Sequence, residues 1–237
     1  RVAVYAQQID RMDQGIGRII KALEDTNRLD NTLVLFLADN GGCDEIINGT
    51  KTRHGDFARG GTTPEVFPGE PDTYASYGYG WANASNTPFR KYKKWIHEGG
   101  NASPLIAHWP VRIKDHGALR HQISHVTDLM ATSVDVSGAT YPKTFKGHDI
   151  IPKAGISLAS AFDDKPLNRP EPLFWEHIGN RGMRDGRWKL VAGKRGDWEL
   201  YDMEQDRTET NNLAAQHPER VKEMHTAYTA WARRVGV

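Results

Sequence analysis

The stretch VLFLADNGG at residues 34–42 indicates the fold class of this chain. An apolar run of this length is too short to span a membrane and is typical of a buried strand in an α/β sheet. The run ends in a carboxylate, Asp39, an amide, Asn40, and two glycines. Ligands of open α/β sheets bind at the carboxyl ends of the strands, and oxygen donors of this kind suit Ca²⁺ or Mg²⁺. The stretch therefore predicts a metal site; a strand followed by an ordinary Asn-Gly turn is the alternative.

Composition narrows the classes of protein to consider. The chain has 237 residues, of which 38% are hydrophobic and 26% charged, as is typical of a globular domain. Lys and Arg number 31 against 30 Asp and Glu, so the net charge of +1 does not indicate a nucleic acid or an anionic membrane surface as a partner. The single cysteine, Cys43, excludes an intrachain disulfide, and no apolar run is long enough for a membrane span.

The apolar spacing of the first 26 residues predicts an amphipathic helix. No capping residue precedes this pattern, and residues 1–5 do not have the features of a signal peptide. We therefore expect the chain to be a fragment, with an unusual natural start as the alternative. The compartment stays open between the cytoplasm and the periplasm or secretion.

Further elements of an α/β body follow from short apolar runs and helical spacing. We expect strands at residues 33–38 and 104–109 and a helix at residues 120–137 that ends at Gly138. The long connection at residues 41–87 is rich in Gly, Asn, Ser, Thr and Pro, and it carries aromatic residues at positions 74 to 81. Because long connections in compact domains are usually functional, we expect an ordered loop at the mouth of a site.

The pattern changes after about residue 165. Short strands are expected at residues 173–176, 187–191 and 198–202, and a final amphipathic helix opens at His217. These elements predict a small α+β appendage. The expected division is residues 1–165 for the α/β body and residues 166–237 for the C-terminal subdomain.

A second cluster of candidate site residues lies in the stretch PFRKYKKWIHEGG, residues 88–100. It places four basic side chains within five positions. If the stretch is extended, one face directs a lysine such as Lys93 at an anionic group such as sulfate or phosphate. A solvated basic edge is the alternative. Glu98 is a less favoured catalytic candidate, and Cys43 has no obvious partner for a nucleophilic role.

Taken together and in order, these motifs resemble the C-terminal part of a bacterial arylsulfatase of the alkaline-phosphatase superfamily. The resemblance covers almost all of the chain. The segments that carry it are residues 5–13, 35–42, 87–110, 125–129 and 198–214.

The resemblance implies a specific fold and chemistry. The fold is α/β, part of an alkaline-phosphatase-like mixed-sheet sandwich followed by a small α+β C-terminal subdomain. The implied activity is Ca²⁺-dependent hydrolysis of sulfate esters by a formylglycine nucleophile. Asp39 and Asn40 match the calcium ligands, and Lys93 matches the lysine that contacts the sulfate group in catalysis and substrate binding. The Cys/Ser-x-Pro-x-Arg motif that gives formylglycine and the other metal ligands are not visible here, so we expect this chain alone to be inactive.

The implied substrate is a small aryl or carbohydrate sulfate ester, and the oligomeric state stays open. One alternative is a phosphodiesterase or phosphonate monoester hydrolase of the same superfamily, because those enzymes share the Asp-Asn pair. The other alternative is a non-catalytic protein that retains the fold. A Cys/Ser-x-Pro-x-Arg motif upstream of this chain would distinguish the enzyme from the non-catalytic protein.

Overall fold

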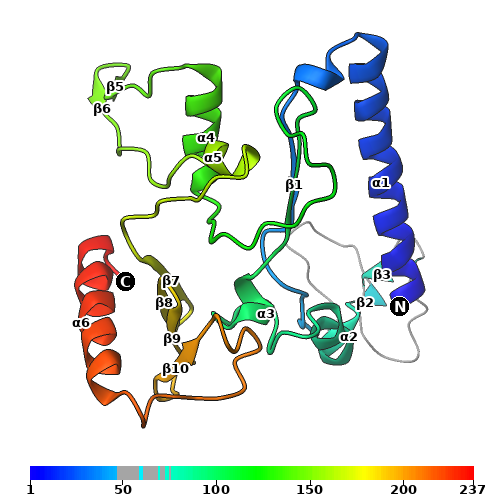
Figure 1. The fold of residues 1–237 in the computed structure, drawn as a ribbon. Coiled ribbons are helices and arrows are strands. Elements are labelled where there is room, and N and C mark those ends of the chain that lie inside the picture. The colour runs from blue at the N-terminus through cyan, green and yellow to red at the C-terminus, as the bar shows by residue number, and fades with distance from the viewer. Residues whose placement is uncertain (47–58, 61–68, 70–72, 75) are drawn as a thin grey trace. The chain divides into compact units, whose positions relative to one another are not determined.

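A computed structural model describes residues 1–46, 59–60, 69, 73–74 and 76–237 (Figure 1). The chain divides into two compact units. The first unit comprises Arg1–Ala22, Leu37–Leu105 and Pro172–Val237, and the second comprises Leu23–Phe36 and Ile106–Glu171. The division expected at residue 165 stays a prediction. Within the described ranges, no helix has the length and apolar character needed to cross a membrane.

The first predicted element is helix α1, Val2–Asp25. It ends because Asn27 takes a left-handed conformation, with φ of 53°, and the Arg28 amide then donates to the Leu23 carbonyl at 2.8 Å. This is the hydrogen-bond pattern of a Schellman cap. None of the α1 side chains is buried in the structure, and Tyr5 at its start stacks on Tyr77 with ring centroids 4.8 Å apart.

The second unit contains most of the two predicted strands of the body. Strands β1, Val34–Leu37, and β4, Leu105–His108, pair as a two-stranded sheet. Both strands are confirmed. The short 3₁₀ helix η1, Leu29–Asn31, precedes β1. A small hairpin of β5, Thr144–Phe145, and β6, His148–Asp149, completes the strands of this unit.

The helix expected at residues 120–137 is shorter than predicted. Helix α4 spans Asp128–Ser137 and ends, as expected, at a left-handed Gly138 with φ of 67°. Residues 120–127 are not helical because the buried Asp128 carboxylate binds backbone amides of a loop, accepting hydrogen bonds from His125 at 2.7 Å and Ile156 at 2.9 Å. The short helix α5, Ala159–Phe162, follows in the same unit.

The connection at residues 41–87 is partly helical, which corrects the expectation of a loop. Helix α2, Gly78–Ser85, includes the fully buried Ala82. Strands β2, Arg59–Gly60, and β3, Thr73–Tyr74, form a short parallel pair. The remaining part of this connection lies largely outside the described residues. Helix α3, Glu98–Asn101, is a single turn within the second motif.

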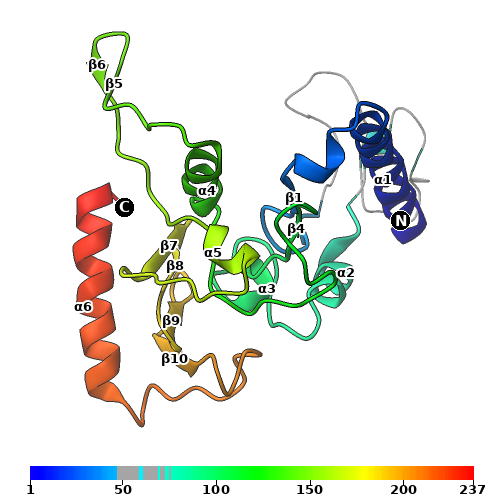
Figure 2. The same cartoon turned by 45° about the horizontal axis from the view of Figure 1, so that its top comes forward.

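The C-terminal elements form a four-stranded antiparallel sheet in the order β10-β9-β8-β7. The strands are β7, Leu173–His177; β8, Asn180–Asp185; β9, Trp188–Ala192; and β10, Glu199–Asp202. Helix α6, Pro218–Val235, lies along this sheet in both views (Figures 1 and 2). Three strands and the helix are confirmed predictions. Strand β8 was not predicted, because its sequence NRGMRD lacks apolar alternation.

An apolar core joins this sheet to α6. Leu190 and Leu200 are fully buried in it, together with Met183 and Met224. Phe174 of β7 stacks on Trp231 of α6 with ring centroids 5.2 Å apart and planes within 8°. Each buried aliphatic side chain contributes about 1.5–3 kcal/mol of transfer free energy, so this core stabilises the sheet that supports the candidate site.

The core leads to a prediction about stability. Leu200→Ala should lower the free energy of unfolding of the protein by about 2–5 kcal/mol, because it leaves a cavity at a fully buried position. Urea denaturation followed by circular dichroism measures this change. Leu119→Ala is the matched control, since Leu119 is 80% exposed, and its effect should stay within about 0.5 kcal/mol. Equal effects of the two substitutions would contradict the assignment of this core.

Candidate functional site

Backbone hydrogen bonds bring the two predicted motifs together in the first unit. The Gly41 amide donates to the Gly100 carbonyl at 3.0 Å, and the Lys93 amide donates to the Gly42 carbonyl at 3.0 Å. The segment after Asp39 and Asn40 therefore lies against the turn that carries Lys93. We call this pairing of residues 41–42 with residues 93 and 100 the backbone clasp.

The glycines of both motifs are required by close approach of the backbone. A Cβ atom on Gly41 would lie 1.8 Å from the Gly99 carbonyl oxygen, and one on Gly99 would lie 2.2 Å from the Arg90 carbonyl oxygen. Real Cβ atoms do not come so close to backbone atoms. A side chain at Gly41 would therefore separate the two motifs, and one at Gly99 would collide with the Arg90 carbonyl within the second motif.

The predicted metal ligands stand at the end of β1. Asp39 is exposed and Asn40 is half-buried, and the Asn40 amide donates to the Gly41 carbonyl at 2.9 Å, which leaves its side-chain oxygen as an acceptor. A carboxylate and an amide oxygen fit a hard cation, but Ca²⁺ takes about six to eight oxygen ligands. Within the described part of the chain, no group of three or more His, Cys, Asp and Glu side chains is placed to hold a metal. These two residues therefore suit part of a calcium site only.

The stretch that carries Lys93 is not extended, so the expectation that one face of an extended stretch directs a lysine at an anion does not hold. Lys91 and Lys94 take left-handed conformations, with φ of 68° and 83°, and each lysine points to a different partner. The Lys91 ammonium lies 4.3 Å from the centre of the Trp95 ring. The Lys93 ammonium lies 3.9 Å from the Cys43 sulfur and 3.7 Å from a carboxylate oxygen of Glu45, and its side chain is 34% exposed.

Lys94 is bound more firmly than Lys93. Its ammonium lies 2.9 Å from the carboxylate of Asp44, which is almost fully buried. The hydrogen bond to Asp44 raises the pKa of Lys94, so the lysine stays protonated. Lys94 is held in this close pair, whereas the contacts of Lys93 with Glu45 and Cys43 among the described residues are long. Lys93 is therefore the better placed of the two to take an external anion.

Glu98 is a structural residue rather than a catalytic one. Its carboxylate lies 2.7 Å from the fully buried ammonium of Lys189, which also lies 2.9 Å from Glu209. Burial raises the pKa of Glu98, but the charge and hydrogen bond of Lys189 outweigh it and hold this pKa below its usual value. Sequence patterns do not single out Lys189 or Glu209, because nothing local marks a buried charge whose partner lies far along the chain.

A second polar cluster surrounds Glu199 at the start of β10. Its carboxylate accepts a hydrogen bond from the Tyr201 hydroxyl and lies 3.4 Å from both the Arg90 guanidinium and the Nε2 atom of the buried His97. The hydrogen bond with His97 lowers the pKa of Glu199 to about 2; burial opposes this shift, and Tyr201 and Arg90 add to it. This cluster holds Arg90 and His97, which flank Lys93 in the sequence.

The aromatic residues before the second motif are partly placed by α2. Tyr79 and Trp81 are more than half exposed, and the Tyr79 ring lies 6.2 Å from that of Tyr92. Tyr77 stacks on Tyr5. The expectation that this segment lines the mouth of the site stays a prediction.

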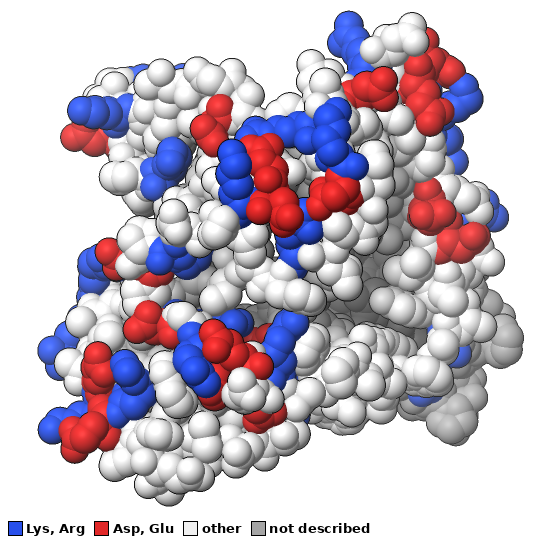
Figure 3. Space-filling model, viewed as in Figure 1, with Lys and Arg blue, Asp and Glu red and all other residues white. Residues whose placement is uncertain are grey.

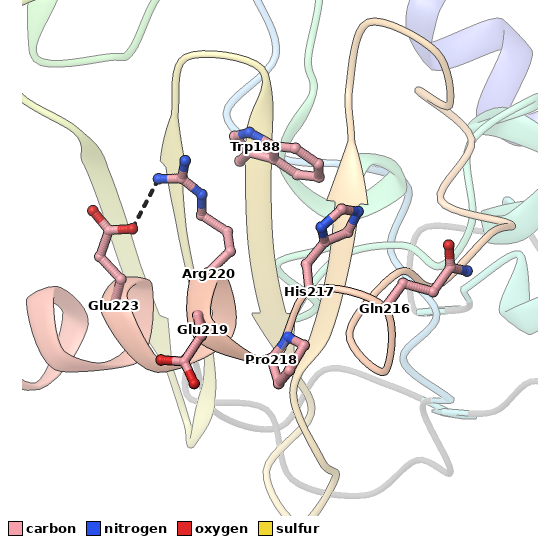
Figure 4. Close-up of a pocket in the computed structure, with 7 residues that line it drawn as sticks. All are labelled: Trp188, Gln216, His217, Pro218, Glu219, Arg220 and Glu223. Carbon is pink, nitrogen blue, oxygen red and sulfur yellow. Dashed lines mark hydrogen bonds and ion pairs between the residues drawn. The ribbon is translucent and has the colours of Figure 1, made fainter.

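A pocket elsewhere in the first unit was not expected from the sequence. It has a volume of about 430 Å³ and lies at the start of α6 (Figure 4). The ring centroids of Trp188 and His217 lie 5.3 Å apart, and the Arg220 guanidinium donates a hydrogen bond to the Glu223 carboxylate at 2.9 Å. The pocket contains neither of the predicted motifs, and its arginine already has a carboxylate partner, so we do not take it as the site.

The clasped motifs join, through their backbones, a turn that carries an ammonium group to a segment that carries oxygen donors for a cation. Such a pair suits an anionic group that is held between a metal and a lysine. Charge elsewhere gives no competing anion surface on the face drawn in Figure 3, where acidic and basic side chains are interspersed.

Comparison with known proteins identifies the family. The model of the sulfatase family matches residues 1–139. The chain belongs to the sulfatase family. A second model, the C-terminal part of N-sulphoglucosamine sulphohydrolase, matches residues 89–230 of this sulfatase chain.

Individual relatives agree with this assignment. The sulfatase chain is 30% identical over 249 residues to an uncharacterized sulfatase of Schizosaccharomyces pombe, covering 99% of the chain and 44% of the relative. It is 30% identical over 180 residues to an arylsulfatase of Klebsiella aerogenes, covering 72% of the chain and 36% of that enzyme. The chain thus spans about two fifths of the length of these relatives. Bacterial origin and arylsulfatase specificity stay predictions.

A solved structure supports the fold. The crystal structure of Ps i-CgsB in complex with k-i-k-neocarrahexaose matches 93% of the sulfatase chain and 40% of its own, with a TM-score of 0.66 at 22% identity. The predicted alkaline-phosphatase-like α/β fold is confirmed.

The backbone clasp leads to a prediction about Gly41. Gly41→Ala in the full protein should lower the free energy of unfolding by about 2 kcal/mol or more, because the new methyl group meets a backbone oxygen that cannot move away alone. Gly80→Ala in α2 is the control, since a Cβ atom there meets nothing within 4 Å, and its effect should stay within about 1 kcal/mol. Thermal melting compares the two. A Gly41→Ala protein with the same melting temperature as the wild type would contradict the backbone clasp.

The low pKa of Glu199 leads to a prediction about acid stability. Its ionised carboxylate stabilises the fold above the ordinary pKa of 4.5, and this contribution is lost as the pH falls toward about 2. Glu199→Gln removes the titration, so the loss of unfolding free energy between about pH 6 and pH 3 should shrink by about 1–2 kcal/mol. Urea denaturation across this range measures it. Glu204→Gln, at a 63% exposed side chain, is the control, and its stability should change with pH as that of the wild type does. If the stability of Glu199→Gln changes with pH in the same way as the wild type, the role of this cluster is refuted.

Proposed function

We propose that the protein containing this chain hydrolyses sulfate esters, with Ca²⁺ and a formylglycine nucleophile that comes from a part outside this chain. The observation that supports this proposal is the backbone clasp. In a chain of the sulfatase family, it sets the lysine turn beside the Asp-Asn pair, so both motifs serve one site. The proposed metal ligands on this chain are Asp39 and Asn40.

Lys93 has the main chemical role among the residues of this chain. When bound, Ca²⁺ would supply positive charge that neutralises the sulfate oxygens, and the formylglycine would supply the nucleophile. The Lys93 ammonium binds the sulfate group in the ground state. As the ester bond breaks, negative charge gathers on the sulfuryl and leaving oxygens, and the Lys93 ammonium stabilises that charge. Lys94, the residue after Lys93, forms an ion pair with Asp44, and this pair holds the turn in place.

The proposed substrate is a small aryl or carbohydrate sulfate ester. A relative named as an arylsulfatase supports the first, and the oligosaccharide in the similar crystal structure supports the second. The net charge of +1 does not indicate nucleic acid as a substrate.

Substitution of the proposed ligands tests this function in the full-length protein. Asp39→Ala should abolish Ca²⁺-dependent hydrolysis of 4-nitrophenyl sulfate. Lys93→Ala should lower kcat/KM by about 10²–10³, the usual cost of losing one group that stabilises transition-state charge, with little change in melting temperature. Lys222→Ala, at an exposed position of α6, is the control and should keep wild-type activity.

Two results would overturn the proposal. A strong preference of the wild-type protein for bis(4-nitrophenyl) phosphate over 4-nitrophenyl sulfate would make it a phosphodiesterase of the same superfamily. Failure to hydrolyse either compound, in a protein without a Cys/Ser-x-Pro-x-Arg motif, would make it a non-catalytic member.

A further inference from the structure

Asn86 lies between the two motifs of the proposed site, although no sequence pattern marks it. It follows the last turn of α2, and its own amide donates to the Asn83 carbonyl at 3.2 Å. Its side chain is half-buried and contacts α2, the Asp-Asn-Gly-Gly segment and the lysine turn.

The Asn86 carboxamide makes three hydrogen bonds to three different segments. Its oxygen accepts from the Gly42 amide at 3.0 Å. Its nitrogen donates to the Ala82 carbonyl in α2 at 2.8 Å and to the Lys91 carbonyl at 3.1 Å. One planar group thus connects α2, the segment after the proposed metal ligands and the turn that carries the proposed sulfate-binding lysine.

The backbone of Gly42 shows why this connection matters for the site. Its N–H is held by Asn86, and its carbonyl accepts the Lys93 amide. The Asn86 side chain also holds Lys91, two residues before Lys93. Both ends of the link between the two motifs therefore depend on the same carboxamide.

We infer that Asn86 is a positioning residue of the proposed sulfate site, one that sets the spacing between the Asp39–Asn40 segment and Lys93. This inference rests on the proposed function. The Asn86 side chain forms hydrogen bonds only with backbone groups among the described residues, so it acts through the residues that it holds. Only a carboxamide serves here, because the position needs one acceptor and two donors in a plane; a carboxylate would place its charge against the Ala82 and Lys91 carbonyls.

The test uses Asn86→Asp in the full-length protein, with Asn83→Asp as the matched control. Asn83 is an exposed residue one turn earlier in α2, and its side chain makes no hydrogen bond to the described residues. Hydrogen exchange of peptides covering residues 41–43 and 91–95 reports directly on the link and does not require activity. Asn86→Asp should speed exchange of the Gly42 and Lys93 amides by about tenfold or more, whereas Asn83→Asp should leave it unchanged.

Kinetics on 4-nitrophenyl sulfate then separate positioning from folding. Per folded molecule, Asn86→Asp should lower kcat/KM by about 10- to 100-fold and raise the Ca²⁺ concentration for half-maximal activity, because both motifs lose their spacing. A residue that only stabilises the fold would lower the melting temperature and leave these constants unchanged.

Unchanged exchange in Asn86→Asp would overturn the inference, as would faster exchange with unchanged kcat, KM and Ca²⁺ dependence. A wild-type protein without sulfate ester hydrolysis would instead overturn the proposed function. In that case the exchange comparison alone would support or overturn the holding role of Asn86.

Discussion

The ammonium of Lys189 is fully buried between the carboxylates of Glu98 and Glu209, and the arrangement of the first unit depends on this contact. A buried charge without partners would cost several kcal/mol, so β9 can pack only where both carboxylates meet it. The Glu98 amide also donates to Glu209 at 2.8 Å. The turn at Glu98 is therefore fixed to the C-terminal sheet, and this turn leads to Gly100, which binds Gly41.

The proposed site is built from backbone contacts, and its chemical groups remain accessible. Glycine at position 41 allows the two segments to approach without a side chain between them. Asp39 is exposed, and Lys93 is about one third exposed with only long contacts to its neighbours. Rigid backbone beneath accessible charged groups is the arrangement expected where those groups bind a metal and an anion.

Local rules predicted the elements with strong periodicity and failed where tertiary contacts decide. Helices α1 and α6 and strands β1 and β4 follow from apolar spacing. Strand β8 was missed because it is rich in charged residues, and it forms because β7 and β9 pair with both of its edges. The start of the helix expected at residue 120 was wrong because the buried Asp128 carboxylate binds amides of the preceding loop and of Ile156.

By itself, the sequence determined the family motifs, their order and the chemical type of each donor: a carboxylate and an amide after β1, and lysines before the Glu-Gly-Gly turn. Only the tertiary structure decided that Lys94 forms a close ion pair, because its partner is Asp44, 50 positions away, whereas Lys93 makes only long contacts among the described residues. It likewise decided that Glu98 is structural and that Asn86 links the motifs. The physical reason is that spacing and turn rules act over a few residues, whereas ion pairs and carboxamide bonds join groups that only the folded chain brings together.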